Sequence, residues 1–242
     1  MNKSQKLDVL AFGAHPDDVE LSAGATLAKL AKEGKKTGII DLTMGELGSR
    51  GSGSLRLQEA QNAAKILQLS ARENLKLADG FFEQNKESLL AVVKMIRKYQ
   101  PEIVLANAIE DRHPDHAKGA KLVSDACFLA GLRRVETSLD GQAQSPWRPK
   151  AVYHYIQDHH INPDFVIDVS EFTSLKMDAI RAYASQFYDP ESKEPETPIS
   201  GKAFFEFIES RMVQFGRSIG ANYAEGFTTE RTPGVKSIFD LV

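Results

Sequence analysis

Short apolar runs alternate with helical patterns over the first 132 residues, and this alternation restricts the possible folds more than any other feature. The apolar runs have the length of strands and are bounded by turn-forming or polar residues; they cover 6–12, 36–42, 75–77 and 103–106. Apolar residues at helical spacing occupy the intervals 21–33, 55–69, 86–99 and 118–132. Strand–helix–strand units of this length predict parallel strands joined by right-handed crossovers. The sequence therefore predicts an α/β fold.

The second half of the chain extends this pattern without a visible boundary. Strand-like runs at 151–156 and 164–169 are followed by helical segments at 173–185 and 201–219, which a polar, proline-containing stretch separates. No repeat, low-complexity tract or linker divides the chain, and 242 residues suit one domain with a sizeable core. We expect a single domain over 1–242, with a Rossmann-like, open, mostly parallel sheet and helices on both of its faces.

Composition excludes several classes of protein. The net charge of −3 gives no general attraction to nucleic acid or anionic membranes. No apolar run approaches the roughly 20 residues that span a bilayer, and the N-terminal sequence lacks the long apolar region of a secretory signal. A single cysteine, Cys127, excludes an internal disulfide and a cysteine-rich zinc site. A soluble, cytoplasmic protein is the expectation.

Two clusters of histidine and aspartate follow strand-like runs. His15, Asp17 and Asp18 come directly after the first run. The second cluster follows the run at 103–106, and it contains His113, Asp115 and His116. Sheets of this kind bind ligands at the carboxyl ends of their strands, where the strand order reverses. The two clusters are therefore expected to meet in one site.

The residue types in these clusters suit a catalytic metal. Imidazole and carboxylate groups bind zinc, and a catalytic zinc keeps three protein ligands and one open position; His15, Asp18 and His116 are the candidates. A bound metal lowers the pKa of water toward about 7, so the adjacent Asp17 is placed to accept its proton. His113 is a candidate for contact with a substrate carbonyl or leaving group. Asp115 is a candidate for fixing the tautomer of a histidine.

Other polar residues carry weaker signals. A lone histidine is usually solvated, so His154, His159 and His160 are expected at the surface or at a strand edge. For Glu20, Asp41 and Asp79 we expect capping or solvation, and support of the site is the alternative.

The segment 44–54 contains four glycines, which is typical of a mobile linker or of a loop that wraps a ligand. It lacks the Lys-Ser/Thr ending of a phosphate-binding loop. Arg50 lies in this segment and Arg56 follows it, and either could pair with a carboxylate or phosphate or remain solvated. Arg112 directly precedes His113 and could hold an anionic part of a substrate.

Two motifs together resemble a known family. Ala14-His15-Pro16-Asp17-Asp18-Val19-Glu20 and His113-Pro114-Asp115-His116 are similar to the signature motifs of the LmbE/PIG-L zinc-dependent N-acetylglucosamine deacetylases. Three further stretches, at 41–51, 183–187 and 223–227, resemble the deacetylases of bacillithiol biosynthesis within that family. These stretches are spread along nearly the whole chain.

The resemblance implies an LmbE-like fold and a role for each motif residue. In this family, zinc would be bound by His15, Asp18 and His116, although another divalent metal could serve. Asp17 would be the general base, and His113, supported by Asp115, would assist at the oxyanion or the leaving amine. Arginines matching Arg56 and Arg112 are implied in holding the carboxylates of N-acetylglucosaminyl-malate. The resemblance also implies a homo-oligomer, and some relatives supply a tyrosine from the C-terminal region, which is absent around 203–205.

Three functions remain open from the sequence. The first is removal of acetyl from N-acetylglucosaminyl-malate. The second is action on another N-acetylglucosamine conjugate, such as a chitooligosaccharide or a thiol conjugate, for which two substrate-binding arginines would have no purpose if the substrate is neutral. The third is a metal-free module that binds a sugar or nucleotide.

Overall fold

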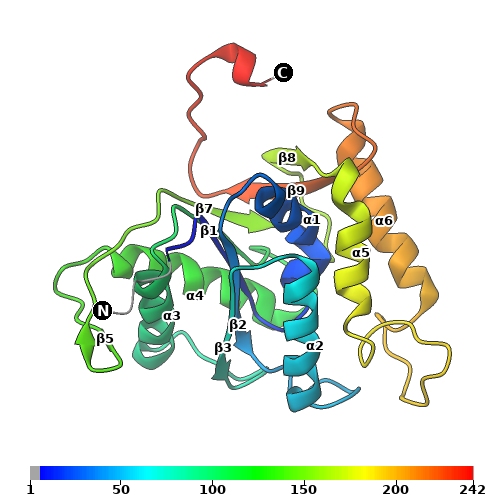
Figure 1. Cartoon of the computed structure of the whole chain (residues 1–242), viewed down its shortest axis with the longest axis horizontal. Coiled ribbons are helices and arrows are strands. Elements are labelled where there is room, and N and C mark those ends of the chain that lie inside the picture. The colour runs from blue at the N-terminus through cyan, green and yellow to red at the C-terminus, as the bar shows by residue number, and fades with distance from the viewer. Residues whose placement is uncertain (1–5, 242) are drawn as a thin grey trace.

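A seven-stranded sheet lies between two layers of helices in the computed structural model, which describes residues 6–241 (Figure 1). Its strands are β1 (Val9–Gly13), β2 (Thr37–Thr43), β3 (Ala71–Leu77), β4 (Ile103–Ala106), β7 (Ala151–Tyr155), β8 (Phe165–Asp168) and β9 (Ala224–Thr229). Their order across the sheet is β3-β2-β1-β4-β7-β9-β8. A separate small hairpin pairs β5 (Ser138–Leu139) with β6 (Gln142–Ala143).

The central strands run parallel, as the sequence pattern predicts. β1 pairs with β2 on one side and with β4 on the other, and β3 and β7 extend the parallel set outward. β9 runs antiparallel to both β7 and β8. The strand order therefore reverses between β1 and β4, which is where open α/β sheets bind their ligands.

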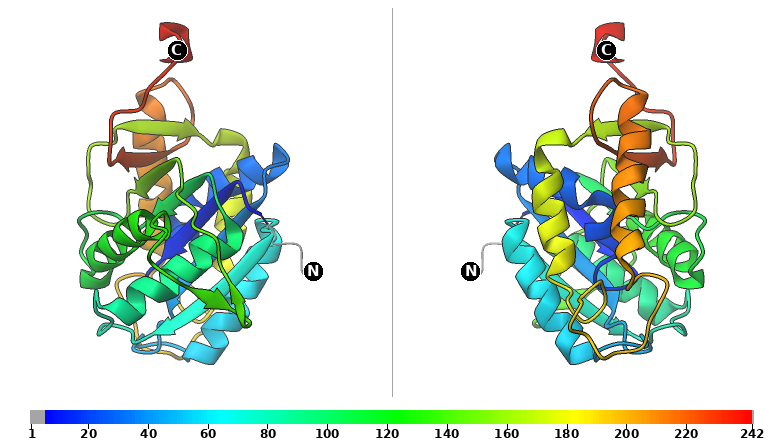
Figure 2. Two further views of the ribbon diagram at one scale, coloured as in Figure 1. Left: turned by 90° about the vertical axis from the view of Figure 1, so that its left-hand side faces the viewer. Right: turned by 90° about the vertical axis from the view of Figure 1, so that its right-hand side faces the viewer.

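Helices cover both faces of the sheet (Figure 2). The helices are α1 (Asp18–Lys32), α2 (Gly53–Ile66), α3 (Lys86–Tyr99), α4 (Pro114–Ala130), α5 (Thr173–Arg181) and α6 (Lys202–Arg217), with short 3₁₀ turns at Ser170–Phe172 and Ile238–Leu241. α3 and α4 lie on one face, and the other four helices lie on the opposite face. None of these helices is long and apolar enough to cross a membrane.

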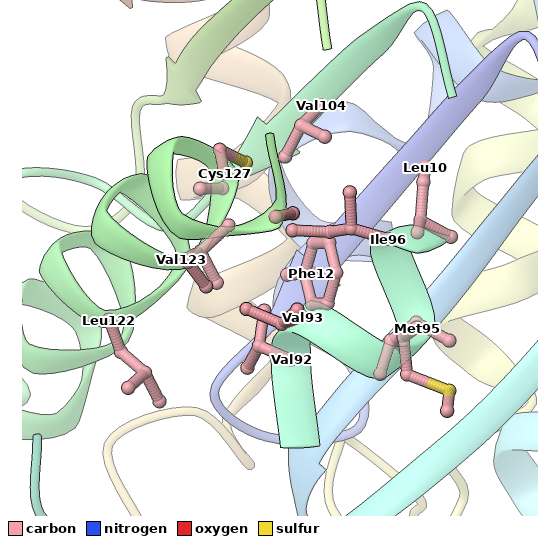
Figure 3. Packing of buried hydrophobic residues seen from close by; sticks show 14 of the residues in the cluster. Leu10, Phe12, Val92, Val93, Met95, Ile96, Val104, Leu122, Val123 and Cys127 are labelled. Carbon is pink, nitrogen blue, oxygen red and sulfur yellow. The ribbon is translucent and has the colours of Figure 1, made fainter. Parts of the chain in front are cut away.

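β1 is buried on both faces because it has helices on both sides. Leu10 and Phe12 point toward α3 and α4, where they meet Val93 and Ile96 (Figure 3). Val9 and Ala11 point the other way and pack with residues of α1. Successive side chains of a strand alternate between the faces of a sheet, so a centrally placed strand must be apolar throughout. This placement fixes the end of β1, and with it the start of the His15 cluster.

Some element boundaries differ from the predicted ones. β9 was not predicted as a strand because Glu225 and Gly226 interrupt its apolar character. β3 begins at Ala71, four residues before the predicted run, and the added residues include the charged Arg72 and Glu73. α5 ends at Arg181, before the predicted end at Ser185. α1 begins at Asp18 rather than at Leu21, so Asp18 lies on the first turn of a helix and Asp17 is its N-cap.

Candidate active site

The two polar clusters come together at the carboxyl ends of β1 and β4, as the sequence predicts. The imidazole rings of His15 and His113 have centroids 4.6 Å apart, and those of His113 and His116 are 5.1 Å apart. These rings line a cavity of about 290 Å³ together with Asp17, Asp18 and residues from the glycine-rich segment, the loop before α6 and α6 itself.

The chain makes a tight turn between β1 and α1. Gly13 lies where this turn begins, and a Cβ there would lie 2.9 Å from the carbonyl oxygen of His15. Asp17 occupies the N-cap position of α1 with φ 115° and ψ −26°, a conformation that is uncommon for a residue other than glycine. Such strain is typical of functional sites, where the surrounding structure enforces it. The turn places the side chains of His15, Asp17 and Asp18 at the cavity.

His15, Asp18 and His116 are close enough to share a metal ion. The Asp18 carboxylate lies 3.1 Å from Nε2 of His116 and 3.6 Å from Nδ1 of His15. Nitrogen atoms of His15, His113 and His116 also lie within 4.8 Å of one another. Imidazole and carboxylate donors suit zinc and other divalent transition metals, so the residues fit a catalytic metal. Assignment of Asp18, rather than His113, as the third ligand stays a prediction.

Two further carboxylates orient His15. Its Nε2 lies 3.0 Å from Oδ1 of Asp79 and 3.5 Å from Oδ2 of Asp115. An imidazole bound in this way presents its other nitrogen, Nδ1, to Asp18 and the cavity. Capping or solvation was expected for Asp79, with support of the site as the alternative, and its contact with His15 agrees with the alternative. The Asp115 carboxylate faces His15, whereas the family resemblance pairs Asp115 with His113.

His116 and His113 are each fixed by one hydrogen bond at Nδ1. Nδ1 of His116 lies 2.5 Å from the carboxylate of Asp111, which leaves Nε2 facing Asp18. Nδ1 of His113 accepts a hydrogen bond from the backbone N–H of Asp115 and caps α4. Burial lowers the pKa of His113, and the charges of His15 and His116 lower it further. His113 is therefore neutral, with its proton on Nε2 as a donor.

Asp17 and Asp18 are neighbours with different partners. Nη2 of Arg56 lies 2.6 Å from the carboxylate of Asp17. Burial raises the pKa of Asp17 to about 6, although the charge of Arg56 opposes this rise. Burial also acts to raise the pKa of Asp18, but the charges and hydrogen bonds of His116 and His15 outweigh it and hold the pKa well below the ordinary value. A carboxylate with a pKa near 6 suits proton transfer near neutral pH.

The glycine-rich segment wraps around Arg56. The guanidinium group of Arg56 donates to the carbonyl oxygens of Gly45 and Pro16, as well as to Asp17. Gly45 has φ 64°, and a Cβ there would lie 2.0 Å from Nη1 of Arg56. The backbone N–H of Leu47 donates to Asp79. This segment therefore supports the residues around Asp17 and His15.

The other predicted arginines lie in different surroundings. Arg50 is buried, and it donates to the carbonyl oxygens of Gln186 and Phe187 and to Ser192; it is not among the residues that line the cavity. Arg112 lines the cavity with its side chain about half exposed, and its Nε donates to Asp158 at 2.9 Å. Of the two, only Arg112 lines the cavity, and a substrate-binding role for either arginine stays a prediction.

Several residues of the cavity were not predicted. Arg211 of α6 is buried, lines the cavity, and donates to the backbone carbonyls of Gln157 and Leu21. Phe204 and Phe207 form an apolar wall beside it. No tyrosine lines the cavity in the described part of the chain. His154, expected near the surface, is buried and bonded to the carbonyl oxygen of Asn107 and to Glu230.

Comparison with known proteins identifies the family. The profile described as "PIG-L: GlcNAc-PI de-N-acetylase" matches residues 10–127. The uncharacterized deacetylase YaiS of Escherichia coli is 31% identical over 150 residues, which cover 60% of this chain and 78% of the relative. This chain belongs to the PIG-L/LmbE deacetylase family. The diacetylchitobiose deacetylase of Thermococcus kodakarensis is 29% identical over 90% of this chain and 81% of its own length. The crystal structure of the conserved protein TT1542 from Thermus thermophilus aligns with a TM-score of 0.84 and 34% identity, covering 95% of this chain and 98% of that one.

Other relatives differ in the reactions that their names describe. A probable N-acetyl-alpha-D-glucosaminyl L-malate deacetylase of Bacillus subtilis is 26% identical over 75% of this chain and 84% of its own length. A 4-oxalmesaconate hydratase of Pseudomonas putida is 27% identical over 77% of this chain and 76% of its own length. The family and its deacetylase members make this chain an N-deacetylase, a hydrolase of amide bonds. The metal-free binding module is therefore excluded.

The position of Arg56 yields the first prediction. We expect Arg56→Met to lower kcat by roughly a hundredfold or more, within the range for loss of acid–base catalysis, because it leaves the buried Asp17 without its counter-charge. The loss should be equal for an anionic conjugate and for plain N-acetylglucosamine, since Arg56 is already paired with Asp17. Steady-state kinetics on both substrates measure this. A loss confined to KM for the anionic conjugate would instead support the predicted substrate-binding role of Arg56.

Proposed function

We propose that this protein is a zinc-dependent deacetylase of an N-acetylglucosamine conjugate that carries an anionic group, with N-acetylglucosaminyl-malate of bacillithiol biosynthesis as the leading substrate. The family supports the N-acetylglucosamine part. The anionic group of the substrate is inferred from two cationic side chains at the cavity, Arg112 and Arg211.

Each catalytic role rests on the contacts of this chain's own residues. A metal held by His15, Asp18 and His116 would supply the positive charge that activates water and polarises the acetyl carbonyl. Asp17 accepts the proton of the attacking water and returns it to the amine that leaves, because its carboxylate lies at the cavity with a pKa near 6. His113 donates its Nε2–H to the oxygen that gains charge.

The two cationic groups bind adjacent residues at the cavity, Arg112 the side chain of Asp158 and Arg211 the backbone of Gln157. Arg112 donates to Asp158 through Nε. The two terminal nitrogens of its guanidinium group can therefore make a bidentate contact with a carboxylate of the substrate. Arg211 donates to two carbonyl oxygens, and no carboxylate lies within ion-pair distance of it in residues 6–241. Burial lowers the pKa of Arg211 only to about 10, so it stays charged. A negative group on the substrate would balance this charge.

A neutral oligosaccharide is the second candidate. The apolar wall of Ile199, Phe204 and Phe207 could face a second sugar ring, because aromatic and aliphatic surfaces commonly line small-molecule sites. The relative from Thermococcus kodakarensis is named as a diacetylchitobiose deacetylase, which supports this alternative.

Acetate release from three substrates distinguishes the candidates. We expect kcat/KM to be highest for N-acetylglucosaminyl-malate, lower for diacetylchitobiose and lowest for N-acetylglucosamine. Arg112→Gln should reduce kcat/KM for the malate conjugate by roughly tenfold to a hundredfold, as expected for loss of a charge-assisted hydrogen bond of about 1.5–3 kcal/mol. The two neutral substrates should change little. Preference for diacetylchitobiose, with equal effects of Arg112→Gln on all three substrates, would favour the oligosaccharide.

A further inference from the structure

Two neutral side-chain amides outside both motifs bind the Asp18 carboxylate, beside groups of His15 and His116. One oxygen accepts hydrogen bonds from the backbone N–H of His15, at 2.9 Å, and from Nδ2 of Asn107, at 3.0 Å. The other oxygen lies 3.2 Å from Nε2 of Gln157 and 3.1 Å from Nε2 of His116. Two side-chain amides therefore hold the two oxygens of one carboxylate.

The hydrogen-bond network fixes which way the amide of Gln157 faces. Its Oε1 accepts from Nδ2 of Asn107 at 3.0 Å and from the backbone N–H of Ala108 at 3.1 Å. An oxygen that receives two N–H groups cannot be exchanged with the nitrogen without losing both bonds. Nε2 of Gln157 must therefore face Asp18. Nδ2 of Asn107 likewise binds both Asp18 and Gln157, while its Oδ1 has no hydrogen-bond partner.

Rigid parts of the fold hold both amides. Asn107 follows β4 and is completely buried, and its carbonyl oxygen is bonded to the ring of His154 on the neighbouring strand β7. Gln157 follows β7, and its carbonyl oxygen accepts from the buried guanidinium group of Arg211. The amides thus come from adjacent strand ends, where rotation of either side chain would break several hydrogen bonds.

The two neighbouring aspartates differ in the charge of the groups that hold them. Asp17 is paired with the cationic Arg56, which cancels its charge locally. Within residues 6–241, Asp18 has no arginine or lysine partner: besides His15 and His116, which are the other predicted metal ligands, amides hold it, and these fix its direction without cancelling its charge. An aspartate that binds a metal needs this second kind of support, because a competing cation would weaken the attraction.

We propose that Asn107 and Gln157 form an amide clamp that positions Asp18 as a metal ligand. This inference rests on the assignment of Asp18 in the proposed function. Both are positioning residues: they act through Asp18. The clamp also separates the duties of Asp17 and Asp18, since only the aspartate that is free of an arginine is oriented for the metal.

The test measures metal binding in the absence of substrate. Gln157→Met keeps the length of the side chain and removes the amide donor. We expect its zinc dissociation constant, from competition with a chromophoric chelator, to rise about 10–100-fold, the range for loss of groups that orient metal ligands. The visible absorption of the cobalt-substituted protein should also change, because a misoriented Asp18 alters the coordination geometry.

Gln186→Leu is the matched control. Gln186 also lines the cavity, but its amide donates to Arg50 and Ser185 and does not contact Asp18. Its zinc affinity and cobalt spectrum should match those of the wild type, even if its melting temperature falls. A general loss of stability would instead shift both variants together.

Three outcomes would overturn the clamp. They are wild-type zinc affinity and cobalt spectrum in Gln157→Met, an equal loss in Gln186→Leu, or unchanged affinity in Asp18→Asn, which would leave the clamp nothing to position. If Gln157→Met does not fold, Gln157→Ala removes the same donor with less crowding and is judged by the same criteria. Because no substrate is present, failure of the malate proposal would leave these results unaffected.

Discussion

His116→Ala is expected to lose the bound metal and to reduce deacetylation to background. His116 presents Nε2 to Asp18 because Asp111 holds its other ring nitrogen. Removing the imidazole leaves at most two of the three predicted ligands, and a catalytic zinc site needs three to hold its metal. A chelator should abolish activity of the wild type in the same way, and added zinc should restore it.

Metal content by elemental analysis, measured beside acetate release, checks this expectation. His160→Ala is the matched control, because His160 is exposed, lies outside the cavity and packs against the ring of Phe215. It should keep both metal and activity. Full occupancy and activity in His116→Ala would remove His116 from the ligand set. Restoration by several divalent ions, but not by zinc, would contradict only the choice of metal.

The sequence predicts the position of the site because each strand and helix leaves its own hydrophobic pattern in a short stretch of the chain. That pattern shows where a buried strand ends. β1 and β4 are buried on both faces, so their apolar runs are continuous and their ends are sharp. The histidines and aspartates that follow must then lie at one edge of a parallel sheet. The same reasoning does not predict β9 as a strand, because Glu225 interrupts its apolar run. Its carboxylate is bound by the backbone of α1 and by the buried Lys176, and such long-range partners leave no local pattern.

The partners of the site residues also depend on contacts between distant parts of the chain. Asp79 reaches His15 from the loop after β3, and Gln157 reaches Asp18 from the end of β7. Arg56 has a plausible role toward substrate in the sequence, but the fold places it on Asp17. A glycine-rich segment predicts that the backbone closely approaches a ligand or another part of the protein. In this protein that neighbour is an arginine side chain.

Asp17→Asn should keep the metal and lose catalysis. The amide retains the shape of the side chain and a hydrogen-bonding oxygen, but it cannot accept a proton at neutral pH. General acid–base catalysis contributes about 10²–10⁴-fold, so kcat should fall by roughly that factor with little change in KM. Zinc content should stay near one ion per chain, because Asp17 is turned toward Arg56 rather than toward His116.

Asp18→Asn makes the same chemical change one residue away, and we expect it to weaken metal binding rather than proton transfer. It replaces the carboxylate that faces both His15 and His116, so zinc should bind more weakly and high zinc concentrations should partly restore kcat. Zinc stoichiometry and kcat, measured for both variants across a zinc titration, separate the two roles. Zinc lost from Asp17→Asn and kept by Asp18→Asn would show that the roles are reversed. That result would also require Arg56 to release Asp17 when the metal binds, which the burial and three hydrogen bonds of Arg56 oppose.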